Sequence, residues 1–121
     1  MNSWGSTHEM GILTGVRILD LSQHRSGQMA ARLLAEAGAD VIKIEPPGGD
    51  SARSEPGYIV SNRSKRSVVL DLEAAAGRAE LSRMLGGADV LIHDLGPTAA
   101  VRRGLDDATL QRHAQLIVCG I

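Results

Sequence analysis

The chain has 121 residues, of which 43% are apolar, 22% charged and 2% aromatic, and its formal net charge is −1. This composition predicts one globular domain with an aliphatic core and excludes a disordered chain. The near-zero charge and the few aromatic rings argue against a nucleic-acid-binding protein, which needs a basic surface and stacking platforms.

The first half of the chain predicts a strand, a helix, a strand and a long loop. Residues 17–21 (RILDL) form the first expected strand, and a helix opens at Ser26 and Gly27. Its apolar residues recur at helical spacing and are Met29, Leu33, Leu34 and Ala37. Gly38 is expected to end the helix with a positive φ. Residues 40–45 (DVIKIE) form the second strand, and the stretch 48–66 after it has no periodicity, which is typical of a functional or mobile loop.

The second half repeats the alternation. Strands are expected at 67–72, 89–93 and 116–119, and helical segments at 74–85, 99–103 and 107–114. Such alternation predicts an α/β fold with a Rossmann-like, mostly parallel, five-stranded sheet and flanking helices. Because no helix follows the fifth strand, we expect residues 12–121 to be the incomplete N-terminal portion of a larger domain.

Other features bear on the compartment. Cys119 is the single cysteine, so an internal disulfide and a cysteine-based zinc site are excluded. It lies in the apolar run LIVCGI, where we expect a buried strand thiol. No apolar run approaches the ~20 residues that span a bilayer. Residues 1–11 lack the order of a signal peptide, so we expect a flexible tail and a cytoplasmic protein without membrane contact.

Ligands of open parallel sheets bind beyond the carboxyl ends of the strands. Those ends are expected at 22–27, 45–50, 71–73 and 94–97. The first turn contains only Gly27 of a G-x-G-x-x-G fingerprint, so Glu45 alone would support an NAD site and that interpretation is weak. Asp94 imitates the phosphoacceptor of a response-regulator receiver, but the paired acids that hold Mg²⁺ in receivers are missing.

Histidines and cations leave alternatives open. No two histidines share metal-ligand spacing, and His93 is expected to be a half-buried packing residue. His24 either contacts an anionic ligand or is solvated. Six cations either bind a phosphorylated ligand or form a solvated charge run, namely Arg53, Arg63, Lys65, Arg66, Arg102 and Arg103.

Four segments, in order, carry a resemblance to a known family: GVRILDL, LLAEAGADVIKIEPPGGD, NRSKRSVVLDL and ADVLIHDLGPTAAVRRGL. Over about residues 13–121 the chain resembles family III CoA-transferases of the CaiB/BaiF type. The resemblance implies an interlocked homodimer when full length, with acyl-CoA and a carboxylic acid as its partners and no metal. It implies CoA transfer from the acyl-CoA thioester to the acid through an aspartate nucleophile, and a sister branch racemises 2-methylacyl-CoA. Because that aspartate would follow Ile121, we expect the chain alone to be inactive.

The same resemblance places coenzyme A contacts at the strand ends. The implied contact residues are Arg25, Ser26, Pro46, Leu70, Asp71, Leu72, Glu73, Asp94, Leu95, Gly96 and Arg102, the last as a phosphate-binding arginine. Asp94 replaces the family's asparagine, and Glu73 stands where some members have a base. Unpaired carboxylates at these two positions are expected to weaken CoA binding. They leave open a degenerate, non-catalytic CoA-binding or dimer-scaffolding half.

Overall fold

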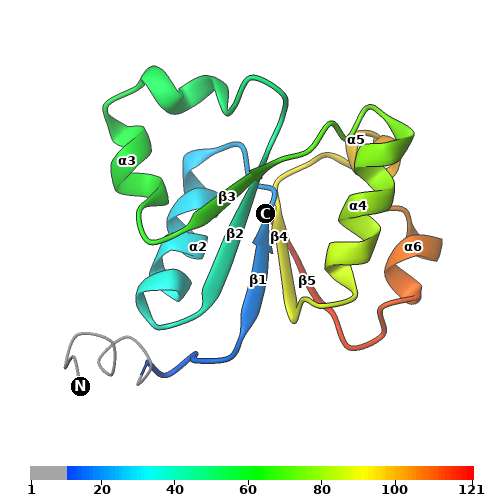
Figure 1. Cartoon of the computed structure of the whole chain (residues 1–121), viewed down its shortest axis with the longest axis horizontal. Helices are drawn as coiled ribbons and strands as arrows, with labels where there is room; N and C mark the ends of the chain where they lie inside the picture. Colours follow the sequence, from blue (N-terminus) through cyan, green and yellow to red (C-terminus); the bar gives the residue numbers. More distant parts are fainter. Residues whose placement is uncertain (1–10) are drawn as a thin grey trace.

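The structure, a computed structural model, describes residues 11–121 and contains one five-stranded sheet. Residues 1–10 of the expected tail lie outside the described residues. The strands are β1 (Arg17–Asp20), β2 (Asp40–Glu45), β3 (Arg66–Val69), β4 (Val90–His93) and β5 (Ile117–Gly120). Every neighbouring pair is parallel, and the order is β3-β2-β1-β4-β5 (Figure 1). The expected parallel α/β sheet is therefore confirmed.

Helices cover both faces of this sheet. They are α2 (Arg25–Glu36), α3 (Gly57–Asn62), α4 (Ala75–Leu85), α5 (Pro97–Arg102) and α6 (Asp107–Gln111), with a 3₁₀ turn η1 (Ser51–Ser54). In Figure 1, α2 and α3 lie on one side of the strands and α4, α5 and α6 lie on the other. Within residues 11–121, no helix combines the length and apolar character needed to cross a bilayer.

The alternation of side chains along β1 explains why two layers of helices form. Ile18 packs with Ala31 of α2, and the next residue, Leu19, packs with Leu81 of α4. Successive side chains of a strand point to opposite faces, so a strand that is apolar at both positions must be covered twice. Ile18 and Leu19 are 1% and 0% exposed, which places β1 at the centre of both cores.

Helix α2 turns only part of its predicted apolar face to the core, where Leu34 packs against the cluster that contains Ile18 and Ala31. Its buried residues are Gly27, Gln28 and Ala31, whereas Leu33 is 57% exposed. Gly38 follows the helix with φ +107°, as expected, and a Cβ there would lie 2.9 Å from Cα of Gly11. Only glycine fits both the positive φ and this close approach.

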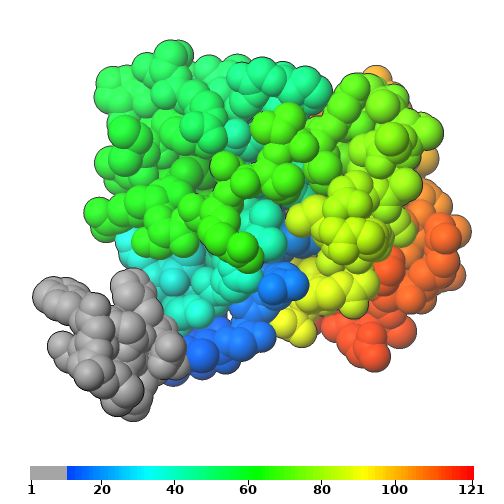
Figure 2. Space-filling model, viewed as in Figure 1, coloured from blue at the N-terminus to red at the C-terminus, as the bar shows by residue number. Residues whose placement is uncertain are grey.

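The stretch 48–66 is more ordered than its lack of periodicity indicates. It contains η1 and α3, so the expectation of an irregular loop is wrong. Asp50 accepts a hydrogen bond from the Ala52 amide (2.8 Å) and thereby caps η1. In Figure 2 the residues of this stretch form the green mass that covers one end of the molecule. Side-chain contacts of this kind order the stretch, and they leave no hydrophobic periodicity in the sequence.

Strand β5 lies at one edge of the sheet, and all four of its residues are exposed. The expected burial of Cys119 is therefore wrong. The LIVCGI run is apolar enough for a core strand, but no described element covers β5 on the side away from β4. His93, at the end of β4, is half-buried as expected.

Candidate functional site

The carboxyl ends of β1 and β4 meet where the strand order changes direction. Asp20 of β1 is in register with Ile92 of β4 and with Lys43 of β2. The chain leaves β1 toward α2 on one face and leaves β4 toward α5 on the other. In open α/β sheets this switch point is where ligands bind.

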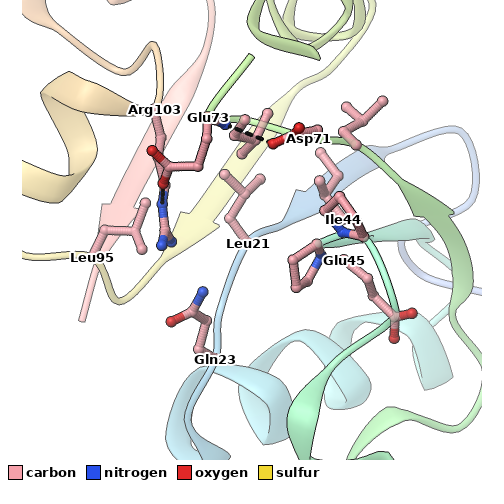
Figure 3. A pocket seen from close by; sticks show the side chains of 12 residues that line it. Leu21, Gln23, Ile44, Glu45, Asp71, Glu73, Leu95 and Arg103 are labelled. Atoms are coloured by element: carbon pink, nitrogen blue, oxygen red, sulfur yellow. Dashed lines mark hydrogen bonds and ion pairs between the residues drawn. The ribbon is translucent and has the colours of Figure 1, made fainter.

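A pocket of about 90 Å³ opens at this edge, and we call it the strand-end pocket (Figure 3). Most of its wall is aliphatic, and its charged lining residues are Glu45, Asp71, Glu73 and Arg103. It is lined by Leu21, Gln23, Ile44, Glu45, Pro46, Pro47, Leu70, Asp71, Leu72, Glu73, Leu95 and Arg103. Apart from Arg103, which follows α5, the residues come from the ends of β1, β2, β3 and β4, so parallel pairing brings together segments as far apart in the chain as Leu21 and Leu95.

Helix α4 fixes the wall formed by residues 70–73. Arg78 donates to the carbonyl of Leu72 (3.1 Å), and the Ala74 amide donates to the carbonyl of Asp71 (3.1 Å). The Asp71 carboxylate in turn accepts from the Glu73 amide (3.1 Å). These bonds hold the segment after β3 in one conformation over the pocket.

Glu73 holds two arginines at the rim of the pocket. Its carboxylate lies 3.3 Å from Nε of Arg102 and 3.5 Å from Nε of Arg103. Glu73 is therefore not the unpaired carboxylate that the sequence suggested. Arg102 is 62% exposed along its side chain, so it can reach a ligand only by sharing or leaving Glu73.

Asp94 also has partners. Its carboxylate accepts from the backbone amides of Gln23 (2.9 Å) and His24 (2.7 Å), and Nδ1 of His24 lies 3.0 Å away. The Asp94 side chain is 5% exposed, so the expectation of an unpaired charge is wrong here too. The carboxylate therefore ties the turn after β1 to the turn after β4. His24 itself is 75% exposed and faces solvent.

A buried polar network lies beneath the same edge. Lys65 donates to Asp20 (2.6 Å), to the carbonyl of Gln28 (2.8 Å) and to the side chain of Asn62 (2.9 Å). Lys43 lies 3.0 Å from Asp50. Burial lowers the pKa of Lys65, although the Asp20 carboxylate acts in the opposite direction.

Most of the expected cation cluster is committed to such internal pairs. Lys65 is 1% exposed and cannot reach a ligand, which corrects the phosphate-binding alternative for this residue. Arg63 pairs with Glu36 and Arg66 pairs with Asp40. Asp40 and Arg66 begin β2 and β3, so this pair lies at the amino ends of the strands, away from the pocket.

Glu45 is likewise occupied. It accepts from Nη2 of Arg53 (2.7 Å) and from the hydroxyl of Tyr58, and its side chain is 2% exposed. Burial, reinforced by the hydrogen bond to Glu45, raises the pKa of Tyr58. Because this carboxylate is buried and already holds Arg53 and Tyr58, it is not open to a ribose hydroxyl, which argues further against an NAD site.

A second cavity, of about 380 Å³, lies on the other side of the turn after β1, and we call it the Arg25 cavity. It lies between the start of α2 and the η1–α3 segment. Its lining is mainly polar and consists of Gln23, His24, Arg25, Gln28, Ser51, Ala52, Glu55, Gly57, Tyr58 and Ser61. Gln23 lines both cavities, so they adjoin at this residue.

The implied contact residues thus fall into three groups. Six of them line the strand-end pocket, namely Pro46, Leu70, Asp71, Leu72, Glu73 and Leu95. Arg25 faces the other cavity, while Ser26, Asp94, Gly96 and Arg102 line neither. The sequence did not single out Leu21, Gln23, Ile44 or Pro47 as contacts, whereas Arg103 was among the cations that could bind a phosphorylated ligand. The alternation within β1 and β2 and the strand-end rule together would have indicated the first three.

These features define an α/β protein with a pocket at the switch point of a parallel sheet, and comparison with known proteins gives its family. Residues 13–121 match the family model described as CoA-transferase family III. The chain therefore belongs to CoA-transferase family III, which confirms the resemblance seen in the sequence.

Individual relatives agree. The chain is 36% identical to the succinate–glutarate CoA-transferase of Agrobacterium fabrum over 126 residues, covering 90% of this chain and 32% of that protein. It is 38% identical over 120 residues to the formyl-CoA:oxalate CoA-transferase of Bradyrhizobium diazoefficiens, covering 90% and 28%. The crystal structure of Rv3272 from Mycobacterium tuberculosis superposes with a TM-score of 0.87 at 33% identity and covers 91% of this chain and 33% of that one. The chain thus spans about a third of the length of these relatives.

Proposed function

We propose that this chain is the CoA-binding portion of a family III CoA-transferase and that the strand-end pocket receives the nucleotide end of coenzyme A. The whole protein would move CoA between an acyl-CoA thioester and a carboxylic acid. The relatives named above carry out such transfers according to their names, which supports the reaction class.

The observation that carries the proposal is the character of the pocket. Its aliphatic wall, which includes Leu21, Ile44 and Leu95, suits a flat base (Figure 3). Arg103 lines the pocket, and Arg102 lies beside it on the same Glu73 carboxylate, where a phosphate of the same ligand would lie. One guanidinium group binds two phosphate oxygens at once. The pocket can therefore hold the base while an arginine holds a phosphate of the same ligand.

The described residues would bind and orient the ligand without supplying a nucleophile. We propose that the carboxylate that accepts the acyl group belongs to a part of the protein after Ile121, and that full-length subunits pair as dimers. A second candidate, a non-catalytic CoA-binding or dimer-scaffolding half, is favoured by one observation. Glu73 occupies both rim arginines, and an anionic ligand must compete with it.

Calorimetric titration of the chain with coenzyme A tests the proposal. Leu72→Trp fills the pocket and should abolish binding, whereas Leu33→Trp on the exposed face of α2 should bind as the wild type does. Adenosine 3′,5′-bisphosphate should compete with coenzyme A, and pantetheine should not. Equal binding by the two tryptophan variants would rule out this pocket. Absence of any binding would favour the scaffold.

A further inference from the structure

Arg25 differs from every other arginine among residues 11–121. Each of the others donates a hydrogen bond to a carboxylate, a carbonyl or a hydroxyl, and Arg25 donates none. It is the first residue of α2 and lines the Arg25 cavity, on the opposite side of Gln23 from the strand-end pocket.

The cavity is shaped around this side chain. Nη2 of Arg25 lies 2.8 Å from the position that a Cβ on Gly57 would occupy, so any larger residue at the start of α3 would push the guanidinium away. The hydroxyls of Ser51 and Ser61 also line the cavity, whereas the Gln28 amide is already bonded to Asp50 and Asn62. Glu55 is the one acidic residue in the lining, and it is exposed. The cavity therefore offers one unpaired cation and several neutral hydrogen-bonding groups.

We infer that the Arg25 cavity binds the free carboxylate of a dicarboxylic acid or of its CoA thioester, with Arg25 as the ion-pair partner. This inference rests on the proposed function and names the class of substrate. A carboxyl group loses its charge when it becomes a thioester, so a cation gains nothing from holding the reacting group of an acyl-CoA. A second carboxylate keeps its charge throughout the exchange, and a guanidinium binds it through two parallel hydrogen bonds.

The position of the cavity fits this role. With a nucleotide in the strand-end pocket, the rest of the ligand can pass Gln23 and enter the Arg25 cavity, because Gln23 lines both. The volume of about 380 Å³ exceeds that of a four- or five-carbon acid, which leaves room for the chain that joins the two carboxyl groups.

Two matched ligand pairs test the inference on the whole 121-residue chain. The first pair is succinyl-CoA and butyryl-CoA, which differ in the distal carboxylate. The second is succinate and butyrate, titrated without CoA and followed by the NMR signals of the Arg25 guanidinium and of the Gly57 and Ser61 amides. We expect wild-type chain to prefer the dicarboxylic member of at least one pair about tenfold, the range of a charge-assisted hydrogen bond.

Three variants sharpen the test. Arg25→Gln should remove the preference, and Arg83→Gln should keep it, because Arg83 pairs with Glu80 on the surface of α4. Glu55→Gln removes a negative charge that repels the succinate carboxylates, so this variant should bind succinate more tightly. A preference in the thioester pair identifies the acyl donor as the source of the carboxylate, and a preference in the acid pair alone identifies the free acid.

Two results would overturn the inference: no preference in either pair, or an equal loss of preference in Arg25→Gln and Arg83→Gln. Failure of the proposed function can be told apart from failure of this inference. If the proposed function is wrong, the chain does not bind CoA, but the titrations with succinate and butyrate still show whether Arg25 prefers the dicarboxylic acid.

Discussion

Gly77 of α4 lies directly against the backbone of Asp71, and a Cβ on Gly77 would be only 1.9 Å from the Asp71 carbonyl oxygen. Asp71 lines the strand-end pocket, so this contact sets how closely α4 approaches the pocket wall. A glycine is required here for space, since its φ does not fall in the left-handed region.

Replacing this glycine should therefore damage both stability and binding. In an open helix Gly→Ala stabilises by about 1 kcal/mol, but the clash at Asp71 forces the backbone apart, and such overpacking costs about 1–3 kcal/mol. We expect Gly77→Ala to lower the free energy of unfolding in urea and to weaken CoA binding. Gly87→Ala is the matched control, because its Cβ would meet nothing closer than 3.8 Å. Equal stability of the two variants would show that α4 does not press on residue 71.

Glu73→Gln should strengthen the binding of coenzyme A. The change releases Arg102 and Arg103 from a carboxylate that is 55% exposed, so the gain is that of a surface ion pair, about 0.2–1 kcal/mol. The gain should shrink at high salt. Glu80→Gln, which disrupts the pair with Arg83 on α4, should leave affinity unchanged in the same titration. A weaker-binding Glu73→Gln variant would mean that Glu73 itself holds the ligand.

By the same reasoning, Arg102→Ala should weaken coenzyme A binding by less than the ~1.5–3 kcal/mol of a charged hydrogen bond that has no competitor. The reason is that wild-type Arg102 already donates a hydrogen bond to Glu73. In the Glu73→Gln background the cost should rise. A double-mutant cycle measured by calorimetry gives the coupling, and a coupling of zero would show that the pair does not form in solution.

The Asp50 carboxylate makes the free energy of unfolding depend on pH in the acidic range. Burial alone would raise its pKa, but the Ala52 amide and Lys43 outweigh burial, and its pKa lies below the ordinary 3.8. A depressed pKa stabilises the fold above pH 3.8, and this stabilisation is lost as the pH falls through the folded-state pKa. The difference in unfolding free energy between wild type and Asp50→Asn should therefore narrow below about pH 4. A difference that stays constant from pH 7 to pH 2.5 would contradict the Asp50–Lys43 pair.

Tyr58 is the single tyrosine, so its ionisation can be followed by absorbance at ~295 nm. Burial and the hydrogen bond to Glu45 raise its pKa above 10.0, and the linked stability is present below pH 10 and lost as the pH rises above it. Folded chain should show no tyrosinate signal at pH 11, and chain in guanidinium chloride should titrate near the ordinary value of 10.0. A folded-state midpoint near that value would mean that Tyr58 is free.

The sequence predicted the parallel sheet because hydrophobic periodicity and glycine stops are local signals. Asp40–Glu45 and Gly38 were placed correctly from such signals alone. The order within 48–66 could not be predicted, because Asp50 and Lys65 fix that segment through partners on other strands. The exposure of Cys119 follows from its place at a sheet edge, which composition does not reveal.

The site was predictable to the extent that it follows the backbone. Leu70, Leu72 and Leu95 line the pocket because parallel strands end together. The state of each charge was not predictable, since the sequence cannot show that Asp94 accepts amides from a turn some seventy residues earlier. Nor could it show that Arg25 alone remains unpaired among the arginines of residues 11–121.

The most direct test of nucleotide binding at the strand ends is an NMR titration of the chain with adenosine 3′,5′-bisphosphate. Saturable amide shifts should appear at 70–73, at Leu95 and at Gln23, which line the strand-end pocket. Shifts confined to other surfaces, such as the groove around Arg78 and Arg112, or no shifts up to millimolar ligand, would contradict the account.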